Sequence, residues 1–191
     1  IVAGEIIARV SGMSWEQFVQ TRIMEPLQMN NSFTSQAGMK DKANLAIPHS
    51  TSTGKIRTIS LFGDQMVGAA GGIVSNVDDM SKWMITQLNK GKYGNNGEKQ
   101  LFAEERQREM WEIHTVERAS RNPRYNSHFA GYGLGWGLSD IKGNLNASHT
   151  GGLPGMLSIV TMIPDMKLGI VILTNTESGG GAAFSAISRT I

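Results

Sequence analysis

The sequence predicts an α+β protein, and the order of its elements carries this prediction. In roughly the first two thirds of the chain, apolar residues recur at helical spacing between polar, glycine-bearing segments. From residue 132 the period changes, and runs rich in Ile, Val and Thr indicate strands. Helices and loops followed by antiparallel strands are typical of the α+β class. We therefore expect residues 1–131 to be mainly helices and loops, and residues 132–191 to form sheet strands and a final helix.

Two helices are expected at the start of the chain. Gly12 is placed to end the first one, and Pro26 the second. Between them, Ser14 and Gln17 have the spacing of a capping box, in which each side chain bonds the other residue's backbone N–H. The first helix has an apolar face made of Ile1, Val2, Ile6, Ile7 and Val10.

A third helix is predicted after a second capping-box pattern, Ser75-Asn76-Val77-Asp78. Gly91 is expected just beyond its last turn. Residues 101–119 have the composition of a further, charged helix, and residues 120–131 of a loop. The apolar face of the third helix would consist of Val77, Met80, Trp83, Met84 and Leu88.

Strands are expected in the remainder of the chain. Residues 132–138 alternate glycine with larger side chains, as a strand that lies close to other backbone would. Residues 157–163 and 168–174 are rich in β-branched residues, and residues 164–167 supply a turn, so this pair is predicted to be an antiparallel hairpin. Residues 182–191 return to helical spacing.

Composition argues against several classes of function. The net charge is only +2 and no run of Lys or Arg occurs, which argues against a nucleic-acid partner. The absence of cysteine excludes disulfides and thiolate metal sites. His49, His114 and His128 lack the spacing of metal ligands, so no metal or other cofactor is expected. No apolar run has the length of a membrane span.

Both ends of the chain have the character of cut ends. Ile1 opens an apolar helix with no capping residue before it, and the final helix reaches Ile191 with no cap after it. Natural termini are usually polar and frayed. We therefore expect the chain to be a piece of a longer protein, truncated at both ends.

Several segments, taken in order, form a combined pattern. They are Pro26-Leu27-Gln28-Met29, Ala70-Gly71-Gly72-Ile73-Val74-Ser75, Asp79-Met80-Ser81-Lys82-Trp83, Tyr132-Gly133-Leu134-Gly135-Trp136, His149-Thr150-Gly151-Gly152-Leu153-Pro154-Gly155 and Thr174-Asn175. Their number, order and spacing resemble the serine β-lactamase and penicillin-binding-protein family, in particular its class C-like and esterase-like branch. The resemblance implies a partial β-lactamase/transpeptidase-like fold, with antiparallel strands flanked by helices. Residues 1–191 would be the C-terminal part of one such domain.

Enzymes of this family form an acyl-enzyme with three sequence elements: a Ser-x-x-Lys nucleophile, a Tyr or Ser motif that ends in Asn, and a Lys-Thr-Gly-type strand. Only the third element is matched here, with His149 where many relatives have Lys. The resemblance implies that the first two elements belong before Ile1.

The resemblance also implies roles for the matched segment. The backbone N–H of Gly152 would donate to the oxyanion of the tetrahedral intermediate. Thr150 would bond a substrate carbonyl or carboxylate, and Gly151 would keep the strand open to the substrate. His149 would stand beside the catalytic Tyr and orient polar groups. The alternative is a strand that ends in a glycine-rich turn with a surface histidine.

Two further segments imitate the missing elements. Ser52-Thr53-Gly54-Lys55 satisfies Ser-x-x-Lys, but it lies in a polar stretch and not at the start of an apolar helix. Tyr93-Gly94-Asn95 satisfies Tyr-x-Asn, but it follows the expected helix stop at Gly91. Both are predicted to be surface turns without a catalytic role.

By resemblance, the parent protein would be a serine hydrolase acting on an ester, amide or β-lactam carbonyl of a small-molecule or peptide substrate. This chain alone would be inactive. A histidine at position 149 is mostly neutral near pH 7, which favours esters and D-amino-acid peptides over β-lactams. The alternative is a non-catalytic binding or structural module. The resemblance also suggests the periplasm or cell surface, and an exposed edge strand at 168–174 predicts self-association.

Overall fold

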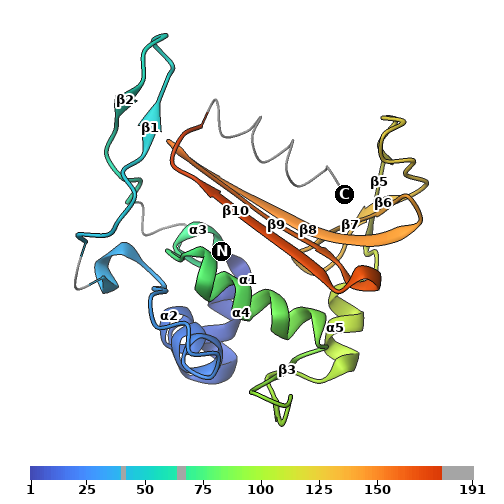
Figure 1. The fold of residues 1–191 in the computed structure, drawn as a ribbon. Coiled ribbons are helices and arrows are strands. Elements are labelled where there is room, and N and C mark those ends of the chain that lie inside the picture. Colours follow the sequence, from blue (N-terminus) through green and yellow to red (C-terminus); the bar gives the residue numbers. More distant parts are fainter. Residues whose placement is uncertain (40–41, 64–67, 178–191) are drawn as a thin grey trace. The chain divides into compact units, whose positions relative to one another are not determined.

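The computed structural model describes residues 1–39, 42–63 and 68–177 (Figure 1). The helix predicted at 182–191 lies outside these residues. The described chain divides into two compact units. One contains Ile1–Lys82, Gly151–Leu157 and residues 173–177, and the other contains Trp83–Thr150 and Ser158–Ile172.

The first unit opens with the two predicted helices. Helix α1 (Val2–Ser11) ends at Gly12, whose φ of 70° is left-handed. Helix α2 (Trp15–Val19) begins with the predicted capping box: Ser14 Oγ accepts the Gln17 N–H at 3.2 Å, and the Gln17 side chain accepts the Ser14 N–H at 3.2 Å. The chain then widens into the π-helical segment η1 (Gln20–Met24) before Pro26.

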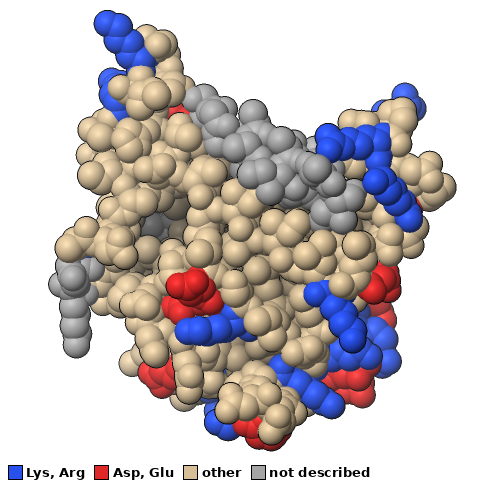
Figure 2. Space-filling view, in the orientation of Figure 1, with Lys and Arg blue, Asp and Glu red and all other residues tan. Residues whose placement is uncertain are grey.

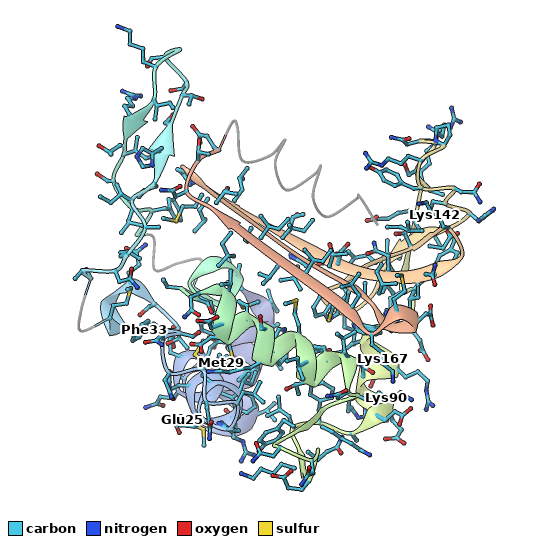
Figure 3. The ribbon with its side chains drawn as sticks, in the orientation of Figure 1. Glu25, Met29, Phe33, Lys90, Lys142 and Lys167 are labelled. Atoms are coloured by element: carbon cyan, nitrogen blue, oxygen red, sulfur yellow. The ribbon has the colours of Figure 1, made fainter. Side chains whose placement is uncertain are left out.

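Short elements complete this unit. They are the 3₁₀ turn η2 (Gln36–Gly38), the antiparallel pair β1 (His49–Ser50) and β2 (Arg57–Thr58), and helix α3 (Gly68–Gly71). A single antiparallel bridge joins Phe33 to Val74. The buried apolar side chains of this first unit include Val19, Met24, Leu27 and Met29. Figure 3 labels Met29 and Phe33 in this part of the chain.

The predicted third helix is α4 (Val77–Leu88), but its cap differs from the prediction. Asn76 caps it, because Asn76 Oδ1 accepts the Asp79 N–H at 3.0 Å. Ser75 Oγ is instead 2.8 Å from Ser32 Oγ. The predicted capping box at Ser75 is therefore wrong by one residue, since a distant partner engages the serine hydroxyl.

The second unit continues with the antiparallel pair β3 (Lys92–Tyr93) and β4 (Lys99–Gln100). Gly91, predicted to follow the helix, has a φ of 84°, as a residue beyond a helix end often does. The helix predicted over 101–119 is wrong outside residues 104–110. Only α5 (Glu104–Met110) is helical, and β5 (Thr115–Glu117) pairs with β6 (Ala130–Tyr132).

The described sheet has six strands in the order β10-β9-β8-β7-β6-β5. Strands β7 (Gly137–Ile141), β8 (Asn144–Leu153) and β9 (Met156–Ile163) lie between β6 and β10 (Leu168–Thr174). The 3₁₀ turn η4 (Pro164–Met166) joins β9 to β10, which confirms the predicted hairpin. Lys142 and Lys167 mark the turns after β7 and before β10 (Figure 3).

The strand predicted at 132–138 is wrong, because a turn interrupts it. Gly133 N donates to Trp136 O at 2.8 Å, and Gly135 has a φ of 81°. The inferred close approach of other backbone is nevertheless present. A Cβ on Gly133 would lie 2.2 Å from Met110 O, which no side chain tolerates.

The core of the second unit joins α4 to one face of the sheet. Met84 from the helix packs with Trp136, Leu138, Ala147 and Met162, all at most 7% exposed. Of the face predicted for α4, Met84 is buried and Val77 is 50% exposed. This core holds strands β7 to β9, and β8 carries His149 to Gly152 at its end.

Candidate functional site

The four predicted site residues lie together at the end of strand β8. His149, Thr150, Gly151 and Gly152 are all exposed, whereas Ala147 of the same strand is fully buried. The strand therefore leaves the core and presents its last residues at the surface. Their assignment to a strand is confirmed, and their chemical roles stay predictions.

Tyr132, which ends β6, contacts His149. The Tyr132 hydroxyl lies 2.9 Å from His149 Nε2, and the two rings meet edge to face with centroids 6.1 Å apart. Sequence reasoning assigned no role to Tyr132. Its segment was interpreted as a strand and as part of the family pattern, and no spacing rule links positions 132 and 149. The structure thus adds Tyr132 to the candidate site.

Glycines on both sides hold Tyr132 in place. A Cβ on Gly131 would lie 2.4 Å from Ile113 Cγ2, and Gly133 lies close to the Met110 carbonyl. Only glycine allows β6 to pack this tightly against the segment after α5. The position of the Tyr132 hydroxyl therefore depends on backbone packing.

We predict that Tyr132→Phe changes the tautomer of His149. The Tyr132 hydroxyl can donate to a neutral Nε2 or accept from its N–H, so its loss removes the partner that favours one tautomer. We expect the nitrogen chemical shifts of the His149 ring to move toward those of a free imidazole. His114, whose Nε2 is 3.1 Å from Glu109 O, serves as the internal reference. Unchanged His149 shifts would mean that the hydrogen bond has no influence in solution.

Gly152 has room around it. A Cβ at this position would lie 3.6 Å from Leu157 Cδ2, an ordinary contact distance, and its φ is not in the left-handed range. Neither packing nor backbone conformation within this unit therefore demands glycine here. A position that is exposed and uncrowded leaves the backbone accessible to a ligand.

The two imitation motifs lie in turns, as predicted. Residues 52–55 lie between β1 and β2, where Gly54 has a φ of 79° and donates to Thr51 O. Tyr93 ends β3, and Gly94, with a φ of 90°, accepts the Gly97 N–H. Neither motif begins an apolar helix, the setting that the nucleophile and its lysine need.

The other histidines are spread over separate elements. His49 Nδ1 lies 3.1 Å from Asn175 O, and His128 Nδ1 lies 2.8 Å from Asp140 Oδ2. Within residues 1–39, 42–63 and 68–177, no group of His, Asp and Glu is arranged to hold a metal ion. In the same residues, no helix has the length and apolar character to cross a membrane.

The buried Asp140 carboxylate has a perturbed pKa. Burial raises the pKa of Asp140, but the hydrogen bonds from the His128 side chain and from the Phe129 and His128 N–H groups outweigh burial. The net effect holds this pKa well below its ordinary value. Because these bonds anchor the backbone of residues 127–129, we assign Asp140 a structural role.

We predict that Asp140→Asn lowers stability by about 2 kcal/mol near pH 7. A carboxyl with a depressed folded pKa stabilises the fold above its unfolded pKa of about 4, and this contribution is lost as the pH falls through the folded value. The difference in unfolding free energy between wild type and variant should therefore shrink below about pH 4. Denaturant titrations at both pH values measure it. Asp165→Asn, at an exposed carboxylate, is the control, and an equal loss at both pH values would contradict the prediction.

Comparison with known proteins identifies the family. The family model described as Beta-lactamase matches residues 1–189. The chain belongs to the β-lactamase family. The family resemblance of its motifs is thereby confirmed, as is the mixed fold of helices and antiparallel sheet.

Members similar to this chain include two curated hydrolases. The unguisins hydrolase of Aspergillus campestris is 23% identical over 193 residues, which covers 98% of this chain and 34% of the relative. A β-lactamase of Escherichia coli is 24% identical over 203 residues, which covers 90% of this chain and 48% of the relative. The chain thus spans between a third and a half of the length of these relatives.

Solved structures show the same fold. The octameric penicillin-binding protein homologue from Pyrococcus abyssi superposes with a TM-score of 0.76 at 22% identity, covering 97% of this chain and 40% of that protein. This similarity shows that the fold of this chain is also found in that protein.

Proposed function

We propose that this chain supplies the substrate-binding strand of a serine hydrolase that acts on an ester, amide or β-lactam carbonyl through an acyl-enzyme. The observation that carries the proposal is the exposed end of β8, where a His-Thr-Gly-Gly segment leaves the core with an uncrowded backbone. The match to a family whose curated relatives are a β-lactamase and a hydrolase supports it.

In this mechanism the substrate carbonyl would lie along the end of β8. The Gly152 N–H would donate to the oxygen that becomes negative when the nucleophile attacks, an interaction that strengthens in the transition state. We propose that the second donor, the nucleophilic serine and its base lie outside the 191 residues of this chain. The chain itself would then bind and orient the substrate but form no acyl-enzyme.

Side chains beside Gly152 would set the substrate preference. Thr150 carries a hydroxyl that can donate to a substrate carbonyl or carboxylate. His149, held by Tyr132 at 2.9 Å, offers an imidazole ring in place of the lysine ammonium that many relatives have. We propose that this favours esters and D-amino-acid peptides over substrates that need a fixed positive charge.

Labelling with a fluorophosphonate or a fluorescent penicillin tests the proposal. We expect the full-length gene product, expressed from its own start codon, to be labelled at one serine outside this chain, and the chain alone to remain unlabelled. Labelling of the chain at Ser52 would overturn the proposed division of roles. No labelling of the full-length protein would favour a non-catalytic binding module.

We also predict that the isolated chain self-associates through β10. Among the described strands, β10 lies at one edge of the sheet, and an unpaired edge is a template for another strand. Sedimentation velocity should show mass that rises with concentration. Leu173→Lys, which adds a charge at a residue 40% exposed on β10, should reduce this rise. Met166→Lys in the preceding turn is the control, and a monodisperse wild-type monomer would contradict the prediction.

A further inference from the structure

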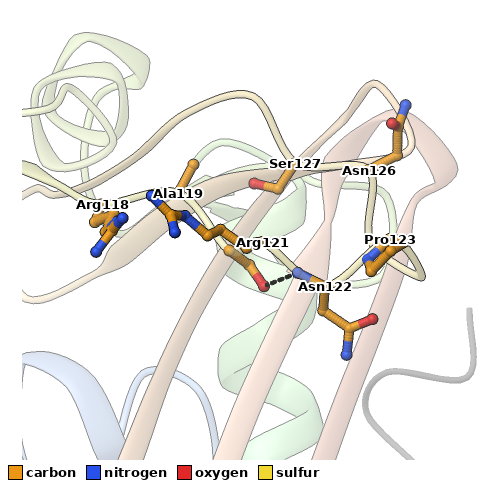
Figure 4. A pocket seen from close by; sticks show the side chains of 8 residues that line it. Arg118, Ala119, Arg121, Asn122, Pro123, Asn126 and Ser127 are labelled. Atoms are coloured by element: carbon orange, nitrogen blue, oxygen red, sulfur yellow. Dashed lines mark hydrogen bonds between the residues drawn. The ribbon is translucent and has the colours of Figure 1, made fainter.

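The loop between β5 and β6 forms a pocket of about 470 Å³. Its lining mixes polar and apolar groups and carries two cations; the polar members are Arg118, Ser120, Arg121, Asn122, Asn126 and Ser127. Figure 4 shows the Arg118 and Arg121 side chains extending toward the same side of this loop. All of these residues belong to the second unit.

Hydrogen bonds shape the loop without using either guanidinium. Ser120 Oγ accepts the Asn122 N–H at 3.3 Å, and Asn122 Oδ1 accepts the Arg124 N–H at 3.0 Å. Tyr125 O accepts the Lys142 N–H at 2.8 Å, which ties the loop to the turn after β7. The loop is therefore built independently of its two lining cations.

The buried carboxylate of Asp140 fastens the end of the loop. It accepts the Ser127 hydroxyl at 3.3 Å, together with the two backbone N–H groups and the His128 ring described above. The Asp140 carboxylate is therefore hydrogen-bonded to the end of the loop and not to its arginines. They leave the guanidinium groups of Arg118 and Arg121 to face the pocket.

The charged side chains that line the pocket are both positive. No Asp or Glu lines it, and both lining arginines are exposed. Arg9, Lys82, Lys90 and Arg106 form salt bridges within the described part of the chain, and none of these bridges involves Arg118 or Arg121. Figure 2 shows Lys and Arg side chains gathered over this end of the sheet.

From this lining we propose that the β5–β6 loop is a binding site for a small anionic ligand that carries a phosphate or carboxylate group. Each guanidinium offers a planar fork of N–H donors that matches either group in bidentate geometry. Ser120, Asn122 and Asn126 add neutral donors. The proposal does not depend on the hydrolase function.

A small anion fits this lining better than a nucleic acid does. A polyanion is bound by a broad stripe of positive charge, whereas this chain has a net charge of only +2. The cations that line the pocket are confined to one loop. The expected ligand therefore places its anionic group between Arg118 and Arg121.

Titration with inorganic phosphate and, separately, with acetate tests the site. The protein is the full chain with labelled backbone amides, and the signals followed are those of Ser120, Asn122 and Ser127. We expect saturable shifts, and an affinity that falls about tenfold or more in the double variant Arg118→Gln/Arg121→Gln. The control is Arg9→Gln/Arg22→Gln, which removes the same charge from exposed sites on other elements.

Each outcome of the anion titration either supports the site or overturns it. Saturation that is lost in the loop variant and kept in the control supports the site, and the stronger of the two anions identifies the group it prefers. Equal weakening in both double variants would mean attraction by net charge alone and would overturn the proposal. It would also be overturned by the absence of saturation with either anion, or by binding only to a DNA duplex with steep salt dependence.

Discussion

Replacing Gly152 by proline in the full-length gene product is expected to slow acyl-enzyme formation by about a hundredfold to a thousandfold. Proline has no backbone N–H, so the substitution removes the donor that we propose for the oxyanion. Removal of one such donor costs about 3 kcal/mol in the transition state. The measurement is the rate of labelling by a fluorescent penicillin or of hydrolysis of a chromogenic ester.

The matched control for this prediction is Gly152→Ala. Alanine keeps the N–H, and among the described residues its Cβ would meet only Leu157 Cδ2 at 3.6 Å, so we expect a rate close to that of the wild type. The melting temperature of both variants separates chemistry from folding. If the proline variant remains folded and labels as fast as the alanine variant, the Gly152 N–H has no part in the reaction.

The largest expected effect on stability is that of Asp79→Ala, which should cost about 3 to 5 kcal/mol. Asp79 is 1% exposed and accepts three short hydrogen bonds: from Asn31 N at 2.8 Å, from Ser32 Oγ at 2.9 Å and from Lys82 Nζ at 2.8 Å. Its loss would leave the buried Ser32 hydroxyl without this acceptor, and with it the Asn31 N–H and the Lys82 ammonium. Denaturant titration measures the free energy of unfolding.

The loss of stability caused by Asp79→Ala should be larger near neutral pH than in acid, because of the pKa of Asp79. Burial raises the pKa of Asp79, but the hydrogen bonds from Lys82, Ser32 and Asn31 outweigh burial and lower it overall. The stabilisation is therefore complete above the unfolded pKa of about 4 and is lost as the pH falls through the folded value. The free energies of unfolding of the wild type and of Asp79→Ala should therefore approach each other at acidic pH. A loss of stability that is the same at every pH would contradict the claim that the ionised Asp79 carboxylate stabilises the fold.

Asp78→Ala is the control for this prediction. Asp78 precedes Asp79 in the first turn of α4 but is exposed. Its replacement should change stability by roughly 0.5 kcal/mol, through the helix dipole and the surface alone. Similar costs for the two neighbours would mean that burial of Asp79 does not set its contribution.

Local signals in the sequence predicted the elements whose hydrogen bonds close within a few residues. Ser14 and Gln17 cap each other across one turn of helix, and Gly12 ends α1 in a left-handed conformation. The hairpin of β9 and β10 follows from two β-rich runs and the turn between them. The strand that carries the His-Thr-Gly-Gly segment was predicted through the family resemblance of that motif and not from local strand character.

Predictions that depended on distant contacts were wrong or were not made. Ser75 carries a capping signal, but its hydroxyl is engaged by Ser32, 43 residues away in sequence. Residues 115–117 were assigned to a helix, yet pairing with β6 makes them a strand. The turn at Gly133 depends on the nearby carbonyl of Met110.

By itself, the sequence determined the α+β class, the family and the surface strand that carries His149 to Gly152. The tertiary structure alone decided that Tyr132 bonds His149, that Asp79 is a buried anion and that Arg118 and Arg121 share one pocket. The physical reason is the range of the interactions. Caps and turns form between neighbours along the chain, whereas burial and side-chain pairing form between segments that only folding brings together.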